Sequence, residues 1–562
     1  MVVGGAWPPT GAQHGGTHGR AVASPPAGPS GAAFRGGTAA GVTRPPAVVH
    51  GLLGGVNDHK NIVLFGAAML SNEKAELSVW LFHTFLKGVG ARSIIAAMAS
   101  SPLLLCVIFC SYCLVALGGR HERGFVLVPT SSSSASEPAC SSVSQVTSDP
   151  NRASVPLAHR QGPCAPASVA SSGKPSLAER LRRDRARRSH ILSKASGRTV
   201  TLSGASVSIP TSLGAAVDSL EYVVTLGFGT PAVQQTVLID TGSDLSWVQC
   251  KPCDSTACYP QKDPLFDPTA SSTYAPVPCD SNACKALADG GYNDGCTNRT
   301  DSSLCQYGIE YGNADTTVGV YSTETLTLKP GVAIRNFSFG CGLRQQGTFD
   351  KFDGLLGLGG APESLVSQTA GTYGGAFSYC LPPGNTTTGF LALGAPSNNT
   401  ADFLFTPLHS SPEGPTFYVV TMTGISVGGK KLDIPPAVFS RGMIIDSGTV
   451  ITGLPETAYS ALRTAFRSAM SAYPLLPPKE DLDTCYNFTG FSNVTVPTVS
   501  LTFDGDVTID LDAPSGILLD DCLAFVGAGS DDTGIIGNVN QRTFEVLYDS
   551  GRGHVGFRPG AC

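Results

Sequence analysis

Histidine is nearly absent from the C-terminal two-thirds of this 562-residue chain. Only His409 and His554 of its ten histidines follow position 200, and neither lies in a motif typical of a catalytic site. Ser–His–Asp and Cys–His hydrolases need an imidazole as general base, and many zinc sites need one as a ligand. The scarcity of histidine therefore argues against all three kinds of chemistry in residues 201–562.

Charged residues are also scarce, at 14% of the chain against roughly 25% in typical soluble domains. Residues 1–118, 119–200 and 201–562 contain 7, 13 and 17 basic residues and 3, 5 and 35 acidic ones, so their net charges are +4, +8 and −18. An acidic body repels nucleic acid and anionic membranes. We therefore expect no nucleic-acid partner for the mature domain.

One long uncharged run, residues 93–119, allows two explanations. If synthesis starts at Met1, the run is long enough to be an internal membrane anchor, which needs about 20 residues. If it starts at Met98, residues 98–118 form a secretory signal peptide, which we favour. Residues 1–60 are rich in Gly, Ala and Pro and are expected to be disordered. Residues 1–97 as a whole form an N-terminal extension that is disordered or of doubtful status.

Residues 119–215 are polar and contain the basic run ERLRRDRARRSH at 179–190, which has too few apolar residues for a core helix. The segment is either a solvated basic stretch or a propeptide. In the second case its arginines lie against the acidic body and leave when carboxylates become protonated. Its position between a signal and a compact domain favours the propeptide.

Beyond residue 221 the sequence changes to short alternating strands separated by Gly, Pro, Asn and Asp turns. This pattern predicts an all-β architecture. The clearest helical stretch is 455–470, where apolar residues recur at helical spacing.

Twelve of the 17 cysteines follow position 200, an even number that fits the disulfide framework of a secreted protein. The CxxC at 250–253 could be a redox motif and its neighbours a metal site, but no nearby histidine or βαβ pattern supports either. We expect no metal and no cofactor. Cys485 with Cys522 is the best pairing in the last third. The expected disulfide cysteines are Cys250, Cys253, Cys258, Cys279, Cys284, Cys296, Cys305, Cys341, Cys380, Cys485, Cys522 and Cys562.

Sequons for N-glycosylation are confined to the acidic body and agree with a secretory route. They begin at Asn298, Asn336, Asn385, Asn398, Asn487 and Asn493.

Two segments share one pattern: residues 236–243 read TVLIDTGS and residues 442–449 read GMIIDSGT, with Asp240 and Asp446 206 positions apart. In each, an apolar strand delivers an Asp into a turn whose Gly permits close backbone approach. An apolar segment that ends in Gly follows each Asp later in the sequence: DGLLG (353–357) follows Asp240, and GIIG (534–537) follows Asp446. A phosphate loop is excluded because no Gly-Lys-Ser/Thr follows. The chain is therefore duplicated, and its two lobes could meet Asp to Asp.

At this point the residues resemble the pepsin-like aspartic proteases, and the Cys-rich insertion looks like the plant nepenthesin-type branch. The resemblance spans 221–562 and implies a bilobal acid-protease fold, with two pseudo-symmetric β lobes (216–400 and 401–562) around a central cleft. The motifs that carry it are DTGSDLSWV (240–248), Tyr311-Gly312, FDGLLGLG (352–359), DSGT (446–449) and IIGNVNQRTFEVLYD (535–549).

By this resemblance Asp240 and Asp446 are the catalytic pair. Two carboxylates that share a site hold one proton between them, and the ionised member activates a water that attacks the peptide carbonyl. We expect two hydroxyls to join the loops beneath the pair and two others to bond its outer oxygens; capping of the turns is the alternative role. The supporting residues are Thr241, Gly242, Ser243, Ser447, Gly448 and Thr449.

Tyr311 and Gly312 lie between two short strands that predict a hairpin folding over the cleft. In the family this Tyr closes over substrate and pairs with a Trp at the position of Trp247. The sequence departs from the family at the flap tip, where Ala314 stands in place of a Gly, so subsite preference is less well determined than the pair of aspartates.

The sequence thus predicts a secreted, zymogen-derived, monomeric aspartic endopeptidase that cleaves protein or peptide substrates between apolar residues at acidic pH, with its own propeptide as a partner. The expected location is extracellular, in the apoplast, with vacuole or chloroplast as alternatives and membrane anchoring if residues 94–118 are not cleaved. A catalytically inactive xylanase-inhibitor-like binding protein is the main alternative, although such proteins typically lose a catalytic motif and both Asp turns are intact here. A chloroplast nucleoid DNA-binding type is a third, against which the acidic body argues.

The mature N-terminus is expected well beyond residue 119. N-terminal sequencing or intact-mass measurement of the purified protein checks this, and retention of residues 1–97 would contradict it.

Overall fold

The part of the chain that the structure describes lies almost entirely after residue 151. The computed structural model describes residues 124–129, 152–162, 164–166, 175–195, 213–214, 222–253, 256–261, 263–292, 296, 304–311, 315–347, 349, 351–383, 388–397, 400–411 and 414–562. The predicted N-terminal extension and signal lie outside these residues. No helix within the described residues has the length and apolar character needed to cross a membrane.

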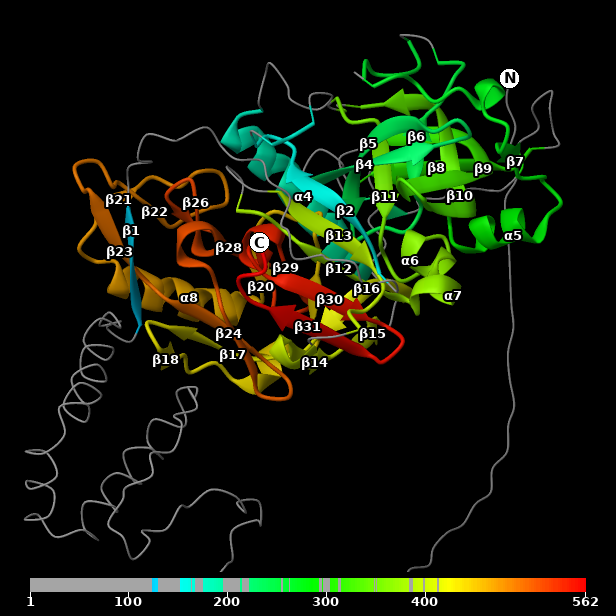
Figure 1. Ribbon diagram of the computed structural model, residues 1–562. Helices are drawn as coiled ribbons and strands as arrows, with labels where there is room; N and C mark the ends of the chain where they lie inside the picture. Colours follow the sequence, from blue (N-terminus) through cyan, green and yellow to red (C-terminus); the bar gives the residue numbers. More distant parts are fainter. Residues whose placement is uncertain are drawn as a thin grey trace, which may run out of the picture. The chain divides into compact units, whose positions relative to one another are not determined.

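The largest sheet has fifteen strands and takes them from both halves of the chain (Figure 1). It includes β12 (Ala376–Cys380), which pairs antiparallel with β30 (Glu545–Asp549), so the two lobes share one sheet. In order, the strands are β14 (Leu404–Pro407), β31 (His554–Arg558), β30, β12, β13 (Gly389–Leu393), β2 (Ala153–His159), β4 (Tyr222–Phe228), β5 (Val233–Asp240), β11 (Gly354–Gly357), β6 (Trp247–Gln249), β10 (Val332–Gln346), β9 (Thr316–Lys329), β8 (Gln306–Tyr311) and β3 (Leu213–Gly214), with β7 (Ala275–Pro276) paired to β9.

Smaller sheets complete the C-terminal lobe. A six-stranded sheet contains β15 (His409–Ser411), β16 (Gly414–Val420), β19 (Met443–Ile445), β29 (Gly534–Ile536), β20 (Thr452–Leu454) and β28 (Phe525–Gly527). Two four-stranded sheets contain β18 (Lys430–Lys431), β17 (Met422–Val427), β24 (Val499–Phe503) and β25 (Val507–Asp510), and β21 (Leu475–Leu476), β22 (Cys485–Tyr486), β27 (Cys522–Leu523) and β26 (Leu518–Leu519). A two-stranded sheet pairs β1 (Phe125–Pro129) with β23 (Asn493–Pro497).

Helices are few, and the longest in the C-terminal lobe is the one expected from the sequence. α8 (Glu456–Ala469) buries Ala458, Tyr459, Leu462 and Phe466, whose spacing of one, three and four residues forms a single apolar stripe. The other described helices are α4 (Leu177–Ala195), α5 (Asn282–Asp289), α6 (Leu365–Gln368) and α7 (Ala370–Tyr373), with single turns η2 (Pro268–Ala270), η3 (Thr400–Asp402), η4 (Pro436–Phe439), η5 (Ala513–Ile517) and η6 (Asn538–Gln541).

The internal duplication is present in the strand pairing. In the N-terminal lobe β11 lies parallel to β5, with Gly357 opposite Asp240. In the C-terminal lobe β29 lies parallel to β19, with Ile536 opposite Ile445, the residue before Asp446. The fold is all-β and bilobal, as the sequence predicts, and each lobe delivers its Asp from the end of a strand that is buried in the lobe.

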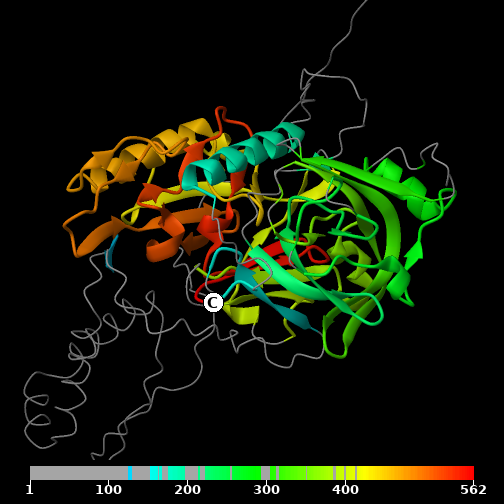
Figure 2. The same ribbon diagram turned by 90° about the horizontal axis from the view of Figure 1, so that it is seen from above.

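The basic run at 179–190 differs from the solvated stretch that its composition allows. It forms most of α4, and the helix lies between strands of the N-terminal half and strands of the C-terminal half (Figure 2). Its buried side chains are Leu181, Asp184, Arg187, Arg188 and Ile191, at spacings of one, three and four residues. The buried face is mostly polar, so a count of apolar residues misses it.

A second part of the 119–215 segment also joins the lobes. β2 lies between β13 and β4 in the large sheet and pairs antiparallel with both. Arg152, just before β2, donates to the buried Ser378 hydroxyl and Glu545 carboxylate. The sequence pattern of residues 119–215 does not predict this strand.

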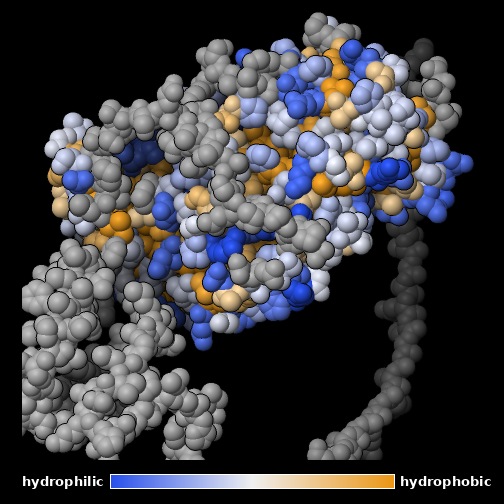
Figure 3. Space-filling view, viewed as in Figure 1, coloured by the Kyte–Doolittle hydropathy of each residue, from blue (hydrophilic) through white to orange (hydrophobic). Residues whose placement is uncertain are grey.

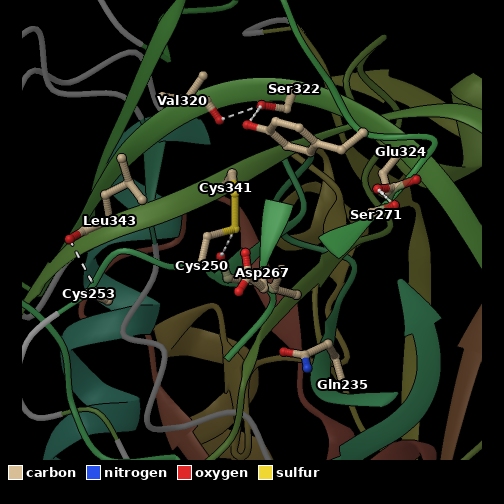
Figure 4. Close-up of a disulfide and its surroundings, with 12 residues drawn as sticks. Gln235, Cys250, Cys253, Asp267, Ser271, Val320, Ser322, Glu324, Cys341 and Leu343 are labelled. Carbon is tan, nitrogen blue, oxygen red and sulfur yellow. Dashed lines mark hydrogen bonds between the residues drawn. A yellow bond between two sulfur atoms is a disulfide. The ribbon is translucent and has the colours of Figure 1, made fainter. Parts of the chain in front are cut away.

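All twelve predicted cysteines are paired, including Cys485 with Cys522 as expected. The Cys250–Cys341 bond links the end of β6 to β10, and Figure 4 shows it beneath the strand that carries Ser322 and Glu324. For the bonds other than Cys485–Cys522, the sequence did not determine which cysteines pair. The remaining bonds are Cys253–Cys258, Cys279–Cys296, Cys284–Cys305 and Cys380–Cys562.

The surface mixes hydrophilic and hydrophobic residues across both lobes on the face shown in Figure 3. Asn336 and Asn493 are exposed, whereas Asn487 is partly buried and its side-chain oxygen accepts a hydrogen bond from the Thr489 N–H at 2.9 Å. The other three sequons lie outside the described residues. Glycosylation remains a prediction.

Replacing both cysteines of one disulfide at a time tests how the length of the loop that the disulfide closes contributes to stability. The chain-entropy model assigns about 4 kcal/mol to Cys485–Cys522, whose cysteines are 37 residues apart, and about 2 kcal/mol to Cys253–Cys258, which are 5 apart. We therefore expect Cys485→Ala/Cys522→Ala to lose more free energy of unfolding than the control Cys253→Ala/Cys258→Ala in denaturant titrations. Equal losses of unfolding free energy in the two double variants would show that loop length does not determine how much each disulfide stabilises the protein.

Candidate active site

Asp240 and Asp446 meet at the junction of the two lobes, and both side chains are fully buried. Asp240 is the last residue of β5, and Asp446 directly follows β19. The turn after each Asp contributes one backbone N–H that donates to the carboxylate. The N–H groups of Gly242 and Gly448 donate to Oδ1 of Asp240 and Asp446, respectively, both at 2.9 Å. The two carboxylates are therefore held in equivalent ways.

Hydroxyl groups complete the symmetric support of the pair. Ser243 Oγ donates to Asp240 Oδ2 and Thr449 Oγ1 donates to Asp446 Oδ2, each at 2.5 Å.

The loops are also tied directly to each other. The Thr241 N–H donates to Ser447 Oγ at 3.1 Å, and the Ser447 N–H donates to Thr241 Oγ1 at 2.9 Å. These reciprocal bonds fix the separation of the two carboxylates.

Position 242 requires glycine because the side chains of Asp446 and Arg187 lie very close to its Cα. A Cβ on Gly242 would lie 3.0 Å from Asp446 Oδ1 and 2.7 Å from Arg187 Nη2. Even alanine would therefore push one of these groups away.

A third charged group, which no motif of the sequence indicates, lies between the carboxylates. The fully buried guanidinium of Arg187, from α4, donates through Nη2 to Asp240 Oδ1 at 2.6 Å and to both oxygens of Asp446 at 2.9 Å. Its Nε donates to Asp446 Oδ2 at 3.0 Å. The only sequence signal was its place within a basic run, which does not distinguish it from its neighbours.

The electrostatics follow from two negative groups and one cation in a buried site. Burial raises the pKa of Asp446; the Arg187 charge opposes this, and repulsion from Asp240 adds to it. Burial alone would lower the pKa of the Arg187 guanidinium, but the charges of Asp240 and Asp446 outweigh it and raise the pKa. The single positive charge of the guanidinium balances the negative charge of only one carboxylate. The second carboxyl group of the pair is therefore favoured in its protonated form.

Other polar residues of α4 bind groups of the C-terminal lobe next to the pair. The Asp184 carboxylate accepts hydrogen bonds from the Val450 N–H at 2.7 Å and the Ile451 N–H at 3.2 Å, immediately after Thr449. Arg188 forms buried ion pairs with Asp184 and Asp481.

Two apolar residues of α4 lie on either side of Arg187 in the sequence and pack in separate hydrophobic clusters. Leu181 packs in a cluster that includes Val450, Ala524 and Val526, and the cluster around Ile191 consists of Phe417, Val419, Ile444 and Ile535. Both clusters are formed by residues of the C-terminal lobe, so apolar packing as well as polar contacts holds α4 against this lobe.

The predicted hairpin is present as β8 and β9, which pair from Gln306 with Val320 to Glu310 with Thr316. The Trp247 Nε1–H donates to the Tyr311 hydroxyl at 2.6 Å, and both side chains are buried. Gly312 and the departure at Ala314 lie outside the described residues.

Comparison with known proteins places the chain in a family. A model described as "Xylanase inhibitor N-terminal" matches residues 222–395, and one described as "Xylanase inhibitor C-terminal" matches residues 417–559. An aspartyl protease family protein of Arabidopsis thaliana is 40% identical over 446 residues, 78% of this chain and 91% of the relative. The chain belongs to the pepsin-like aspartyl protease family.

Other relatives identify the plant branch of this pepsin-like family. The Arabidopsis thaliana aspartyl protease AED1 is 39% identical over 84% of this chain and 100% of its own length, and the aspartic proteinase nepenthesin-1 of Nepenthes gracilis is 38% identical over 61% of this chain and 78% of its own. Among solved structures, conglutin gamma from lupine seeds gives a TM-score of 0.49 at 23% identity, covering 62% of this chain and 94% of that one.

Arg187→Met tests whether the guanidinium holds α4 in the cleft. Removing one partner of a buried ion pair costs about 3–5 kcal/mol. We therefore expect faster hydrogen exchange across residues 177–195, measured by mass spectrometry at neutral pH. The matched control is Arg185→Met, whose side chain is 47% exposed and reaches Asp481 only at 3.5 Å, so its effect should stay below about 1 kcal/mol. Unchanged exchange in Arg187→Met would show that α4 is held by its other contacts.

Proposed function

We propose that the chain is an aspartic endopeptidase that hydrolyses peptide bonds at acidic pH. The observation that carries this is the pair Asp240 and Asp446, brought together by two lobes, with each carboxylate supported by one backbone N–H and one hydroxyl. The named relatives support the same class of activity.

The mechanism uses the two carboxylates in different protonation states. Because two adjacent negative charges repel each other, the pair retains one proton once no cation lies between them. The ionised carboxylate takes a proton from a water molecule, which attacks the peptide carbonyl carbon. The protonated carboxyl donates a hydrogen bond to the carbonyl oxygen, and a proton then passes to the leaving amine nitrogen. The apolar clusters in which Leu181 and Ile191 pack support a preference for apolar residues around the scissile bond.

The protein is made as a zymogen in this proposal, with residues 119–215 as its propeptide. Arg187 occupies the space between the carboxylates where water and the substrate carbonyl must bind. Because burial raises the pKa of Asp446, one proton enters the pair at a higher pH than an exposed Asp would take it. Protonation of the pair leaves the buried guanidinium charge of Arg187 uncompensated, and α4 then leaves.

Secretion is part of the same proposal. The six disulfides between cysteines of the acidic body favour an oxidising compartment, and a signal peptide at 98–118 would lead there. We propose an extracellular, apoplastic location, a monomeric enzyme and glycosylation at the sequons.

An inhibitor-like binding protein remains the second candidate, because the matching family models are described as xylanase inhibitor domains. The intact support of both aspartates favours the enzyme.

Asp240→Asn is expected to abolish proteolysis of a denatured protein substrate by acid-treated protein at about pH 3–5, with a loss of roughly a thousandfold or more. Pepstatin should inhibit the unmodified protein. Asp402→Asn is the matched control, since Asp402 is exposed on η3. Proteolysis that survives Asp240→Asn would refute the mechanism. Absence of proteolysis in every form, together with binding to a xylanase, would favour the second candidate.

A further inference from the structure

Two buried tyrosines come from the strands at which the two lobes join. Tyr379 belongs to β12 and Tyr548 to β30, and neither side chain is exposed. Their hydroxyl oxygens are 2.7 Å apart. Burial raises the pKa of each hydroxyl, and the charge of Asp446 adds to the rise. Both hydroxyls therefore keep their protons at acidic pH and remain hydrogen-bond donors close to Asp446.

A glutamine joins these hydroxyls to the backbone of Asp446. Gln541, in η6, is 2% exposed. Its Nε2 group donates to the carbonyl oxygen of Asp446 at 3.2 Å and to that of Ile536 at 2.8 Å, and its Oε1 atom accepts a hydrogen bond from the Tyr379 hydroxyl. The ladder between β19 and β29 ends one residue earlier, at Ile445 opposite Ile536. The Gln541 side chain thus holds Asp446 against the end of β29.

The direction of each hydrogen bond in this chain of contacts is fixed. The two carbonyl oxygens can only accept, so Gln541 must present its NH2 group to them and its oxygen to Tyr379. The single hydrogen of the Tyr379 hydroxyl is then used on Gln541, so Tyr548 is the donor in its bond with Tyr379. The bonds run from Tyr548 through Tyr379 and Gln541 to Asp446. Because these groups are buried, loss of one member leaves its neighbour without a partner, which is unfavourable.

The two lobes differ at this point, although the rest of the carboxylate support is duplicated. In the N-terminal lobe the carbonyl oxygen of Asp240 accepts a hydrogen bond at 2.8 Å from the Leu358 N–H, directly after the DGLLG segment. The corresponding N–H of the C-terminal lobe belongs to Asn538, after GIIG, and it donates instead to the carbonyl oxygen of Thr449 at 2.7 Å. Asp446 therefore lacks the bond that Leu358 makes to Asp240, and the amide side chain described above supplies a donor in its place.

From these contacts we propose that Tyr379, Tyr548 and Gln541 are positioning residues for the reaction. They act through the backbone of Asp446, which they hold, together with its carboxylate, at the separation from Asp240 that the shared proton and the attacking water require. The proposal rests on the proposed peptidase function and deepens it by assigning residues outside the two Asp turns to the same site.

Tyr379→Phe tests the centre of this set of contacts, because it removes one hydroxyl and keeps the ring. The acid-activated protein is assayed with a quenched peptide that contains an apolar scissile pair, and titration with pepstatin gives the concentration of folded sites. We expect kcat per site to fall about tenfold or more with little change in KM, as is typical when groups that orient a catalytic residue are removed. Tyr274→Phe is the matched control, since it removes a partly buried hydroxyl that lies 2.8 Å from Ser322 Oγ in the N-terminal lobe. Its kcat should be unchanged.

The pH profile of kcat/KM is a second readout, which a loss of stability alone would not move. Burial raises the pKa of Asp446 and Asp240 adds to the rise, whereas the bonds from the Thr449 hydroxyl and the Gly448 N–H lower it. A displaced carboxylate makes these two bonds less well, so its ionised form needs a higher pH. The acidic limb of the profile should therefore move to higher pH in Tyr379→Phe. The titratable groups that act on Asp446 come from α4, β5, β12 and β30: Arg187, which has left the activated protein, Asp240, Tyr379 and Tyr548.

A second variant removes the amide itself. Gln541→Met keeps the length of the side chain but has no donor for Asp446 and no acceptor for Tyr379. We expect the same changes in kcat and in the acidic limb, and the double variant Tyr379→Phe/Gln541→Met should be no worse than Gln541→Met alone, because both substitutions break one set of linked bonds. Losses that multiply in the double variant would show that the two residues act separately and would overturn the assignment.

The positioning role and the proposed function can fail separately. If the unmodified protein cleaves the peptide and both variants keep its kcat and its acidic limb, the positioning role alone is overturned. The same holds if Tyr274→Phe loses as much kcat as Tyr379→Phe. If the unmodified protein does not cleave the peptide, the proposed function is overturned, and the positioning role with it.

Discussion

Mutual repulsion between two buried carboxylates is the constraint on which the rest of this structure depends. Asp240 and Asp446 come from different lobes, yet their loops are tied by reciprocal hydrogen bonds that prevent them from separating. A buried pair of this kind must gain a proton or a cation, because two uncompensated charges in a low-dielectric site are costly. Arg187 supplies the cation here. The same requirement explains why a basic segment and an acidic body belong to one chain.

The features that could be predicted from the sequence depend on short patterns. The two Asp turns, the parallel strands that follow them, the β8–β9 hairpin and α8 each arise from residues within one local element. Disulfides that join distant segments, such as Cys380–Cys562 at a separation of 182, could not be predicted, because many pairings satisfy the same cysteine count. The place of Arg187 could not be predicted either: five other arginines lie at 180–188, and only the packing of a helix against both lobes selects one of the six.

α4 departs from the usual relation between burial and hydrophobicity. A core helix buries an apolar stripe, whereas α4 buries Asp184, Arg187 and Arg188 and pairs each with a specific group of the lobes. Charged and polar contacts of this kind hold the helix only while their partners keep their protonation states. The helix can therefore be held between the lobes by polar contacts, with Leu181 and Ile191 packed in two apolar clusters of the C-terminal lobe.

β2 is held by a different type of contact from α4, and the two should respond differently to acid. Its backbone pairs with β13 and β4 through N–H and carbonyl groups, which do not titrate in the acidic range, and its Val155 and Leu157 side chains belong to the main hydrophobic core. Protonation of carboxylates weakens the polar contacts of α4 but leaves this ladder intact. In the zymogen that we propose, acid should thus release α4 while β2 stays paired in the central sheet.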